Sequence, residues 1–383
     1  KIELKKINRF FLEGKMKIEN ANIWTIKSKV EQKSRNRYGA VDFLERTLLR
    51  LEDEKGNEGW GEMMPIIFTT EKADNATKAM QTVTESLKKM SEIEPISNSN
   101  VIDDLHDLSE LKAARSSIEC ALLDIESKRE QKSFLEKLGG SHTQANLDGP
   151  IGLESPEDAI QKTRKYLSEG ISTVKVKVGV NVKDDANRLI ALRQEFGMDI
   201  EIRMDANGGY TNEEVFEFCN LILPVAVQHF EQPVLPSNDR CFEICREIRE
   251  MGIPVAVDES LFSLQDAEIL VQEDALDVGV IKISKFGGVL IAKKIANLLE
   301  RAGKKCVISA SYESLVGKSM ALALALSLNN TDLAHEVGHF AKEPTITEWS
   351  HNNSSGIMSY GNCIGLGAKG DVEKINSIAT SSF

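Results

Sequence analysis

The chain has 383 residues, 41% of them hydrophobic, and a formal net charge of -12. Its acidic charge argues against a nucleic-acid partner or an anionic membrane surface, because phosphate groups would repel it. No run of about 20 apolar residues is present, and the first residues lack the apolar core of a secretory signal. We therefore expect a soluble, cytoplasmic protein without a membrane or nucleic-acid partner.

The first third of the chain predicts an α+β domain, assigned to residues 16–140 and preceded by an extension at residues 1–15. From Met16 to Met63, apolar and polar residues alternate on both sides of the turn DEKGNEG, which is typical of antiparallel strands. From Thr70 to Leu138 the apolar residues recur with helical spacing, and two glycines follow as a helix stop.

The middle of the chain, residues 141–343, predicts a TIM-type barrel, because short β-branched runs alternate with helical segments. Eight strands without a final helix give the (β/α)7β arrangement of the fold class α/β, and a barrel of roughly 250 residues is typical. Residues 344–383 are irregular and are expected to return to the first domain. The candidate strands are ANLDGPIGL, TVKVKVG, IEIRMDAN, AVQHFEQP, PVAVDES, VGVIKISK, KCVISAS and LAHEVG.

Two sets of residues are assigned to structure rather than chemistry. The six cysteines are expected to be free and buried; Cys241 and Cys245 share a helix face, but no second pair with zinc spacing accompanies them. The pairs Gly208-Gly209 and Gly287-Gly288 lack the spacing of a phosphate-binding loop, so we assign them to loops that need positive φ.

Four of the predicted barrel strands end in a charged residue: Asp205, Glu231, Asp258 and Lys282, separated by 26, 27 and 24 residues. This spacing is one βα unit, so the four charges should meet at the C-terminal mouth of the barrel. Three converging carboxylates repel one another unless a cation compensates them, and oxygen ligands favour Mg²⁺, with Mn²⁺ as the alternative. For any single residue the competing interpretation is a strand-end cap or a salt bridge.

The lysines of TVKVKVG predict a catalytic base. Lys175 and Lys177 point to the same side of one strand, and the valines around them indicate that the strand is buried. A desolvated lysine beside another ammonium group has a lowered pKa and can accept a proton. The alternative is a solvated pair on an edge strand. Lys282 comes from four strands further round the barrel, so the two amines would flank one carbon atom.

These motifs together resemble the enolase superfamily, nearest its muconate-lactonizing subgroup of the mandelate racemase/muconate lactonizing enzyme family, from Met16 to about Gly367. KVKVG is similar to its K-x-K strand and RMDAN, FEQP and VDES to its three metal strands. The resemblance implies Lys177 as the base, Lys175 as its electrostatic neighbour and Lys282, in KISKFGG, as the second acid/base. It also implies supporting or substrate-binding positions at Asn207, Glu259, Lys285 and Glu313.

The resemblance further implies that the first domain caps the barrel and reads the substrate with loops near residues 31–39 and 63–70. It implies a small carboxylate substrate, Mg²⁺ without an organic cofactor, and a homo-oligomer. Dipeptide epimerases of the subgroup have D-x-D after the eighth strand, whereas this chain has Asp332-Leu333-Ala334 and then His335. That departure argues against dipeptide epimerisation.

Three functions remain open from the sequence. The first is racemisation or epimerisation of an amino-acid derivative through an enolate, because a lysine is expected on each face of the substrate. The second keeps the site but performs cycloisomerisation or an o-succinylbenzoate-synthase-type dehydration. The third is a barrel that binds metal and ligand without catalysis, which the retention of all six charged residues disfavours.

Overall fold

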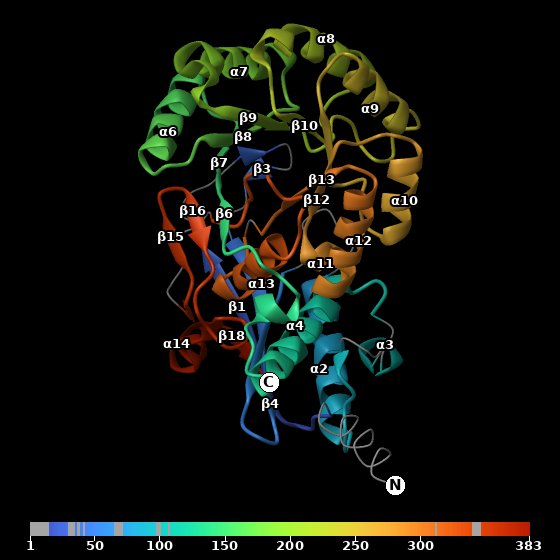
Figure 1. Cartoon of the computed structure of the whole chain (residues 1–383), viewed down its shortest axis with the longest axis vertical. Coiled ribbons are helices and arrows are strands. Elements are labelled where there is room, and N and C mark those ends of the chain that lie inside the picture. The colour runs from blue at the N-terminus through green and yellow to red at the C-terminus, as the bar shows by residue number, and fades with distance from the viewer. Residues whose placement is uncertain are drawn as a thin grey trace.

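The computed structural model describes residues 15–29, 35–36, 39–40, 43–64, 72–96, 101–105, 108–310, 312–338 and 346–383. Two parts stand end to end along the long axis, an α+β part that contains β1, β4 and α4, and a barrel that contains α6 to α12 (Figure 1). None of the helices in these ranges has both the length and the apolar character needed to cross a membrane.

The α+β part, which we call the cap, is a four-stranded antiparallel sheet packed against helices α2 and α4. The strands follow the order β18-β1-β4-β5. The cap comprises β1 (Ile18–Lys29), β4 (Phe43–Asp53), β5 (Glu58–Met63), β18 (Ala379–Ser382), α2 (Ala73–Lys89), α3 (Val101–Leu105), α4 (Lys112–Arg129) and α5 (Phe134–Lys137), with the short strands β2 (Arg35–Asn36) and β3 (Gly39–Ala40) nearby in sequence.

The turn between β4 and β5 shows why the sequence folds this way. Asp53 Oδ1 accepts hydrogen bonds from the backbone N–H groups of Lys55 and Asn57, at 2.9 and 2.8 Å. Gly56 takes a φ of 77°, a conformation that costs glycine little. The predicted hairpin at DEKGNEG is therefore confirmed. Helix α4 is buried over most of its length, because it lies between the cap sheet and the barrel.

The barrel contains seven parallel strands in the order β13-β12-β11-β10-β9-β8-β7, each followed by at least one helix. The strands are β7 (Asp148–Ile151), β8 (Thr173–Lys177), β9 (Glu201–Asp205), β10 (His229–Glu231), β11 (Val255–Val257), β12 (Val278–Ile281) and β13 (Lys305–Ile308). The helices are α6 (Pro156–Ser168), α7 (Val182–Phe196), η2 (Gly197–Asp199), α8 (Asn212–Ile222), η3 (Leu223–Val225), α9 (Cys241–Glu250), α10 (Leu264–Gln272), α11 (Ile283–Phe286), α12 (Val289–Arg301) and α13 (Leu315–Leu326).

An eighth segment closes the barrel between β7 and β13. His335 bridges to Leu147 and Glu336 bridges to Ser309, both in the parallel direction. The backbone N–H groups of the two residues donate to Asn146 O at 2.7 Å and to Ile308 O at 3.0 Å. The predicted (β/α)7β barrel with an α+β cap is confirmed, although the eighth strand is reduced to two bridges.

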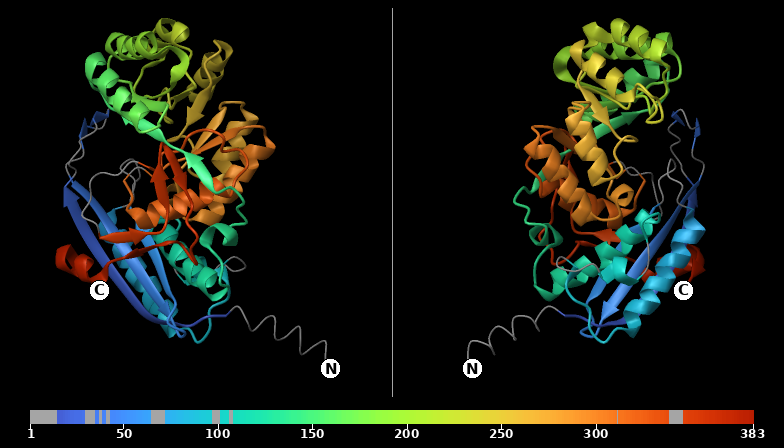
Figure 2. Two further views of the ribbon diagram at one scale, coloured as in Figure 1. Left: turned by 60° about the vertical axis from the view of Figure 1, so that its left-hand side comes forward. Right: turned by 90° about the vertical axis from the view of Figure 1, so that its right-hand side faces the viewer.

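The C-terminal residues run from the barrel to the cap (Figure 2). A three-stranded sheet has the order β15-β16-β6, β14 pairs with β17, and β18 finally pairs antiparallel with β1. The exact domain boundaries proposed from the sequence stay predictions. These elements are β6 (Gln144–Asn146), β14 (Thr347–Trp349), β15 (Asn352–Ser354), β16 (Ile357–Ser359), β17 (Ala368–Gly370) and α14 (Val372–Ile378).

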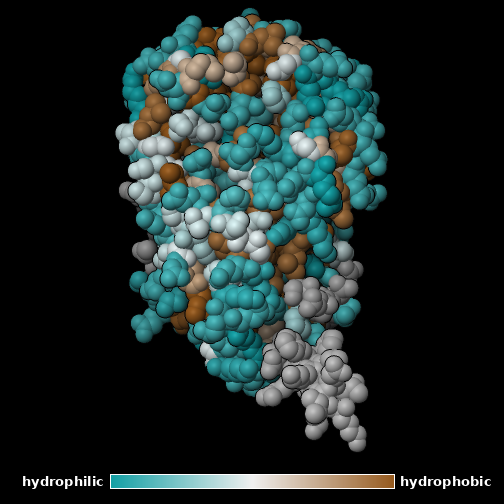
Figure 3. Space-filling model, in the orientation of Figure 1, coloured by the Kyte–Doolittle hydropathy of each residue, from teal (hydrophilic) through white to brown (hydrophobic). Residues whose placement is uncertain are grey.

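The surface and the cysteines agree with an acidic chain whose core is apolar. The face shown in Figure 3 is mainly hydrophilic, with hydrophobic residues in scattered patches. All six cysteines lie in the described ranges and are free; five are buried, and Cys363 is only partly buried. The predicted positive φ is present at Gly208, Gly287 and Gly288, whereas Gly209 has no positive φ and meets the backbone of Gly179 instead.

Candidate active site

Three buried carboxylates lie on adjacent strands at one end of the barrel. Asp205 ends β9 and Glu231 ends β10, and the two residues are paired in register. Asp258 directly follows β11, the next strand in the sheet. Each of the three is at most 1% exposed. Parallel strands with one βα unit between them bring these side chains to the same edge, as the sequence spacing indicated.

Lys175 and Lys177 reach this cluster from β8. Both ammonium groups contact Asp205 Oδ2, Lys175 at 3.3 Å and Lys177 more closely. Lys175 Nζ also lies 2.8 Å from Glu231 Oε2, and its side chain is almost completely buried. The two side chains therefore share one face of the strand, and the alternative of a solvated edge pair is wrong, because β8 pairs with β7 and β9.

Lys282 faces the cluster from the opposite wall. It follows β12, which is four strands from β8 in an eight-membered ring once the closing segment is counted. Its ammonium group contacts Asp258 Oδ2 closely. Lys285, one turn further on, lies 2.7 Å from Asp258 Oδ1 and donates to Asp258 O and Val280 O. Asp258 thus joins both lysines of this segment.

Two supporting residues from the sequence prediction meet beside Asp205. Asn207 Nδ2 donates to Glu259 Oε1 at 3.0 Å, and Asn207 Oδ1 accepts from Lys177 Nζ at 3.1 Å. Burial, followed by the charges of Asp258 and Asp205, raises the pKa of Glu259 to about 7. This pair connects the loops after β9 and β11.

Glu336 is a site residue that the sequence analysis did not name. It lies in the closing segment, 2.5 Å from Lys175 Nζ, and its Oε2 accepts from Ser309 Oγ at 2.8 Å. Burial opposes its charge, but Lys175 and Lys282 outweigh that effect and lower the pKa of Glu336 to about 2. The signal was present in the sequence, because Glu336 is the only acidic residue in the predicted strand LAHEVG.

This placement corrects the comparison with the D-x-D motif. The sequence analysis searched Asp332-Leu333-Ala334, but the segment that closes the barrel is His335-Glu336. Asp332 lies away from the site in an exposed ion pair with Lys305. Glu336 is the carboxylate that the eighth strand contributes to the barrel mouth. The comparison with D-x-D therefore began at Asp332, too early in the chain. Two residues after Glu336 stands Gly338 rather than a second carboxylate, so the departure from D-x-D remains and the argument against dipeptide substrates stays a prediction.

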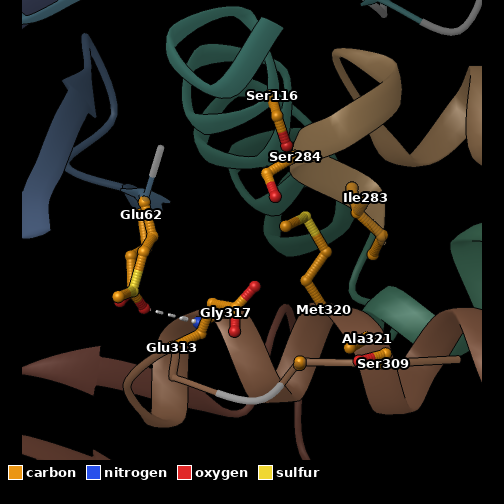
Figure 4. Close-up of a pocket in the computed structure, with 11 residues that line it drawn as sticks. Glu62, Ser116, Ile283, Ser284, Ser309, Glu313, Gly317, Met320 and Ala321 are labelled. Atoms are coloured by element: carbon orange, nitrogen blue, oxygen red, sulfur yellow. Dashed lines mark hydrogen bonds between the residues drawn. The ribbon is translucent and has the colours of Figure 1, made fainter. Parts of the chain in front are cut away.

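A pocket lies between the cap and the barrel beside these residues (Figure 4). Glu313 projects into it, and burial and then the nearby charge of Glu62 raise the pKa of Glu313. Glu62 itself accepts hydrogen bonds from the backbone N–H groups of Ser314 and Gly317, at 2.9 and 3.1 Å. The lining also includes Met64, Ser116, Ile283, Ser284, Ser309, Ala310, Met320 and Ala321.

The predicted specificity loops fall mostly outside the described residues. The described residues do not include 31–34, 37–38 and 65–70. They also do not include the side chains of residues 35–36 and 39. Met63 is buried and Met64 lines the pocket. The assignment of these loops to substrate recognition stays a prediction.

The electrostatics of the three strand-end carboxylates fit a cation. Burial, and then the charge of Asp205, raises the pKa of Glu231 well above its usual range. Burial also opposes the charges of Asp205 and Asp258, but the neighbouring lysines lower both pKa values. In the described ranges no three acidic, histidine or cysteine side chains lie together as a metal group. The donor set nevertheless suits a hard divalent ion, because all three ligands are oxygen atoms.

Comparisons with known proteins agree with this fold. A family model described as Enolase C-terminal domain-like matches residues 158–374. The hydrophobic dipeptide epimerase of Enterococcus faecalis is 27% identical over 356 residues, which cover 92% of this chain and 99% of that protein. The N-succinyl-L-Arg/Lys racemase of Bacillus cereus is 26% identical over 321 residues, which cover 82% of this chain and 85% of that protein.

A solved structure extends the likeness. The dipeptide epimerase of Cytophaga hutchinsonii, complexed with Mg and the dipeptide D-Ala-L-Val, aligns with a TM-score of 0.85 and 25% identity. The alignment covers 96% of this chain and 99% of that structure. Barrel enzymes carry their active sites at the C-terminal ends of the strands, and this capped barrel has its charged residues there. The chain belongs to the enolase superfamily and is an enzyme.

Proposed function

We propose that the chain racemises or epimerises an amino-acid derivative at the carbon atom next to its carboxylate. The observation that carries this proposal is the placement of Lys177 and Lys282 on opposite walls of the barrel, with the strands of the three carboxylates between them. A base on each side of one carbon atom can remove a proton from one face and deliver a proton to the other. The names of the relatives from E. faecalis and B. cereus support this reaction.

Each lysine has a distinct part in the proposed mechanism. Lys177 takes the proton from one isomer and Lys282 from the other, and each returns a proton to its own face. Burial opposes the charge of Lys175, but Glu231 and Glu336 outweigh this effect and raise its pKa, so Lys175 keeps its proton and stays a fixed positive charge. It therefore favours the negative charge that develops on the substrate.

We propose Asp205, Glu231 and Asp258 as the ligands of Mg²⁺, with Mn²⁺ as the alternative and no organic cofactor. When bound, the ion supplies positive charge that stabilises the developing enolate. Burial opposes the charge of Lys282, but Asp258 outweighs it and raises the pKa of this lysine. If Asp258 held the ion, its carboxylate would be less free to pair with Lys282, and the amine of Lys282 would be better able to accept a proton.

The proposed substrate is a small carboxylate with a substituted α-amino group, such as an N-acylated amino acid or a dipeptide. Glu336 gives the site a carboxylate on the wall of Lys175, where the substrate's amino or amide group can donate. We propose that the distal part of the substrate is read from the side of the barrel mouth where Glu313 lies (Figure 4). Asn207 supports the site through its contact with Lys177, Glu259 through Asn207, and Lys285 through Asp258.

Cytoplasmic location and self-association are also proposed. Six free thiols are usual in a reducing compartment. The net charge of -12 disfavours binding to nucleic acid. Equal subunits in a homo-oligomer are proposed from the family resemblance, and sedimentation of the purified chain tests this directly.

Deuterium uptake in D₂O with Mg²⁺ tests the reaction. A library of N-acyl amino acids, dipeptides, betaines and hydroxy acids is incubated with the enzyme, and α-carbon labelling is followed by mass spectrometry. We expect label in an otherwise unchanged N-acyl amino acid or dipeptide, together with its opposite isomer by chiral chromatography. No uptake in any compound, from an enzyme that binds Mg²⁺ by calorimetry, would contradict the proposal.

Lys282→Arg separates two-base chemistry from dehydration or cycloisomerisation. Arginine keeps the positive charge but cannot act as a base, since its pKa exceeds about 12. Interconversion of isomers should therefore be lost. A reaction in which Lys282 only stabilises negative charge would keep measurable turnover.

A further inference from the structure

The segment that follows Lys282 is built against the cap. Lys282 is the N-cap residue of α11, and Gly287, with a φ of 85°, is its C-cap; Gly288 then has a φ of 151°. Helix α12 begins at the next residue. Helix α11 packs against α4 of the cap, so the position of Lys282 is coupled to a helix from another part of the chain.

Glu119 of α4 holds this segment at its glycine pair. Its Oε1 accepts from the backbone N–H of Leu290 at 3.0 Å, at the N-terminus of α12, where a carboxylate is favoured. A Cβ atom on Gly288 would lie 2.2 Å from Glu119 Oε1, so only glycine permits this approach. The carboxylate is nearly inaccessible to solvent, at 2% exposure of the residue.

Arg115 completes the attachment. Its Nη1 donates to Glu119 Oε2 at 3.0 Å and to Gly287 O at 2.5 Å, and its Nε and Nη2 donate to Asp103. The guanidinium therefore joins the carbonyl of the residue that follows α11 to the carboxylate at the start of α12. The ion pair of Arg115 and Glu119 thus contacts the turn between α11 and α12 at both ends, at Gly287 and at Leu290.

The segment of Lys177 is held differently, by residues of the barrel itself. Arg188 Nη1 donates to Lys177 O at 3.0 Å and to Asp185 Oδ1 at 3.1 Å. Asp185 Oδ2 accepts from three consecutive backbone N–H groups, those of residues 179 to 181, and from Tyr210 Oη at 2.8 Å. None of these contacts involves the cap.

We propose that Glu119 and Arg115 are positioning residues of the cap that set Lys282 for proton transfer, while Lys177 is positioned independently by Arg188 and Asp185. This inference rests on the proposed two-base reaction. Proton transfer requires the donor and acceptor atoms to be within hydrogen-bond reach, and a displacement of about 1 Å can cost about 100-fold in rate. Damage to Glu119 should therefore slow chemistry on one face of the substrate more than on the other.

The first test is Glu119→Gln, which keeps the shape of the side chain and removes its charge. The substrate is the fastest N-acyl amino acid or dipeptide of the D₂O library, supplied separately as each isomer. Label exchange with retention reports the lysine that faces the α-proton of that isomer; the lysine is assigned with Lys177→Ala and Lys282→Ala. We expect exchange of the isomer served by Lys282 to fall at least about tenfold, and exchange of the other to stay within about threefold.

Arg188→Gln is the matched control on the other wall. It should give the reverse pattern, with the larger loss for the isomer served by Lys177. The reason is that Arg188 donates to the main chain of Lys177 and not to that of Lys282. Equal losses for both isomers in Glu119→Gln, or no loss in either, would overturn the positioning role.

A second readout does not depend on turnover. Backbone hydrogen exchange of the peptide covering residues 283–292 should accelerate in Glu119→Gln. It should also accelerate in Arg115→Gln, a change at a partly exposed side chain that leaves the core intact. The peptide covering residues 178–188 should be unchanged. If backbone protection stayed at the wild-type level in both peptides, the inference would be overturned, even if no library compound reacts. If the wild-type enzyme caused no label uptake in any substrate, that result would count only against the proposed reaction.

Discussion

The two walls of the active site differ in the distance along the chain over which their supports act. The contact that holds the main chain of Lys177 joins residues 11 positions apart, whereas those that hold the turn after Lys282 join residues 171 and 172 positions apart. The main chain of Lys177 is held by a residue of its own βα unit. The proposed support of the second wall comes from the cap, so it is present only where the cap is docked on the barrel.

This difference explains why α4 is buried over most of its length while carrying charged residues. Glu119 and Arg115 are directed at the α11–α12 turn, and Lys112 Nζ donates to Phe262 O in the loop after β11, at 2.9 Å. Glu62 of β5 similarly accepts from Ser314 and Gly317 at the start of α13. The cap therefore contacts the loops after three successive strands, β11, β12 and β13, on the side of Lys282.

The largest effect should come from removing either lysine. Lys177→Ala and Lys282→Ala should each lower interconversion of the isomers by about 10³-fold or more, because a general base contributes about 10² to 10⁴. Each variant should keep solvent exchange of one isomer, and the retained isomer should differ between the two. Chiral chromatography and mass spectrometry in D₂O measure both quantities. If the same isomer kept its exchange in both variants, the lysines would not serve opposite faces.

Asp205→Asn and Asp258→Asn form a matched pair of ligand changes. Both should weaken Mg²⁺ binding at least tenfold by calorimetry, since each removes one charged ligand. Asp258→Asn should also lower the free energy of unfolding by about 3 kcal/mol, because the buried ammonium of Lys285 loses its ion-pair partner. Asp205→Asn should cost less, because Lys175 keeps Glu231 and Glu336. Urea unfolding without Mg²⁺ checks this order, and equal costs would contradict it.

Mild acid should lower the stability of the fold through buried histidines. Burial lowers the pKa of His351 to about 4 and that of His335 to about 3, against about 6.5 in an unfolded chain. Below pH 6.5 the unfolded chain binds a proton that the folded chain does not, so stability falls as the pH drops toward 4. The slope is about 1.4 kcal/mol per pH unit for each histidine.

His351→Asn isolates the contribution of His351 from that of the other buried histidines. His351 Nδ1 accepts from Gly361 N in the C-terminal residues that lead to β18 in the cap, whereas His335 lies in the segment that closes the barrel. The variant should flatten the pH dependence between pH 6 and 4.5 by about the slope of one histidine. Urea unfolding at several pH values measures the slope, and a variant as steep as the wild type would show that His351 does not titrate in this range.

The sequence predicted the wall of Lys177 better than the wall of Lys282, for a physical reason. Strand periodicity places Lys175 and Lys177 on one face, and the regular βα spacing places Asp205, Glu231 and Asp258 on adjacent strands, because both rules are local. The fold class followed from the same two signals. Nothing local links Glu119 with Leu290, so the support from the cap could be recognised only in three dimensions.

The eighth strand shows a second limit. LAHEVG was recognised as a strand, but only His335 and Glu336 bridge to their neighbours, so the pattern could not identify which residue reaches the mouth. Glu336 was missed because the family comparison directed attention to Asp332. The rule applied to the other strands, that charged residues near the ends of the barrel strands meet at its mouth, would have selected Glu336 instead.

The smallest effect tests the barrel-held wall without touching a lysine. Tyr210→Phe removes one of the donors to Asp185 Oδ2, a hydrogen bond of 2.8 Å to a charged group. We expect a cost of about 1.5 kcal/mol in unfolding free energy, at the low end for charged acceptors, because Asp185 keeps its backbone donors and Arg188. Tyr166→Phe, which removes a neutral hydrogen bond to Pro150 O, is the matched control and should cost about 1 kcal/mol.

Only Tyr210→Phe should slow exchange of the isomer served by Lys177, by less than about tenfold, while the isomer served by Lys282 is unaffected. Equal slowing of both isomers would show that the two lysines are not positioned independently. Lys177 would then be positioned by the barrel as a whole and not by the loop between β8 and α7.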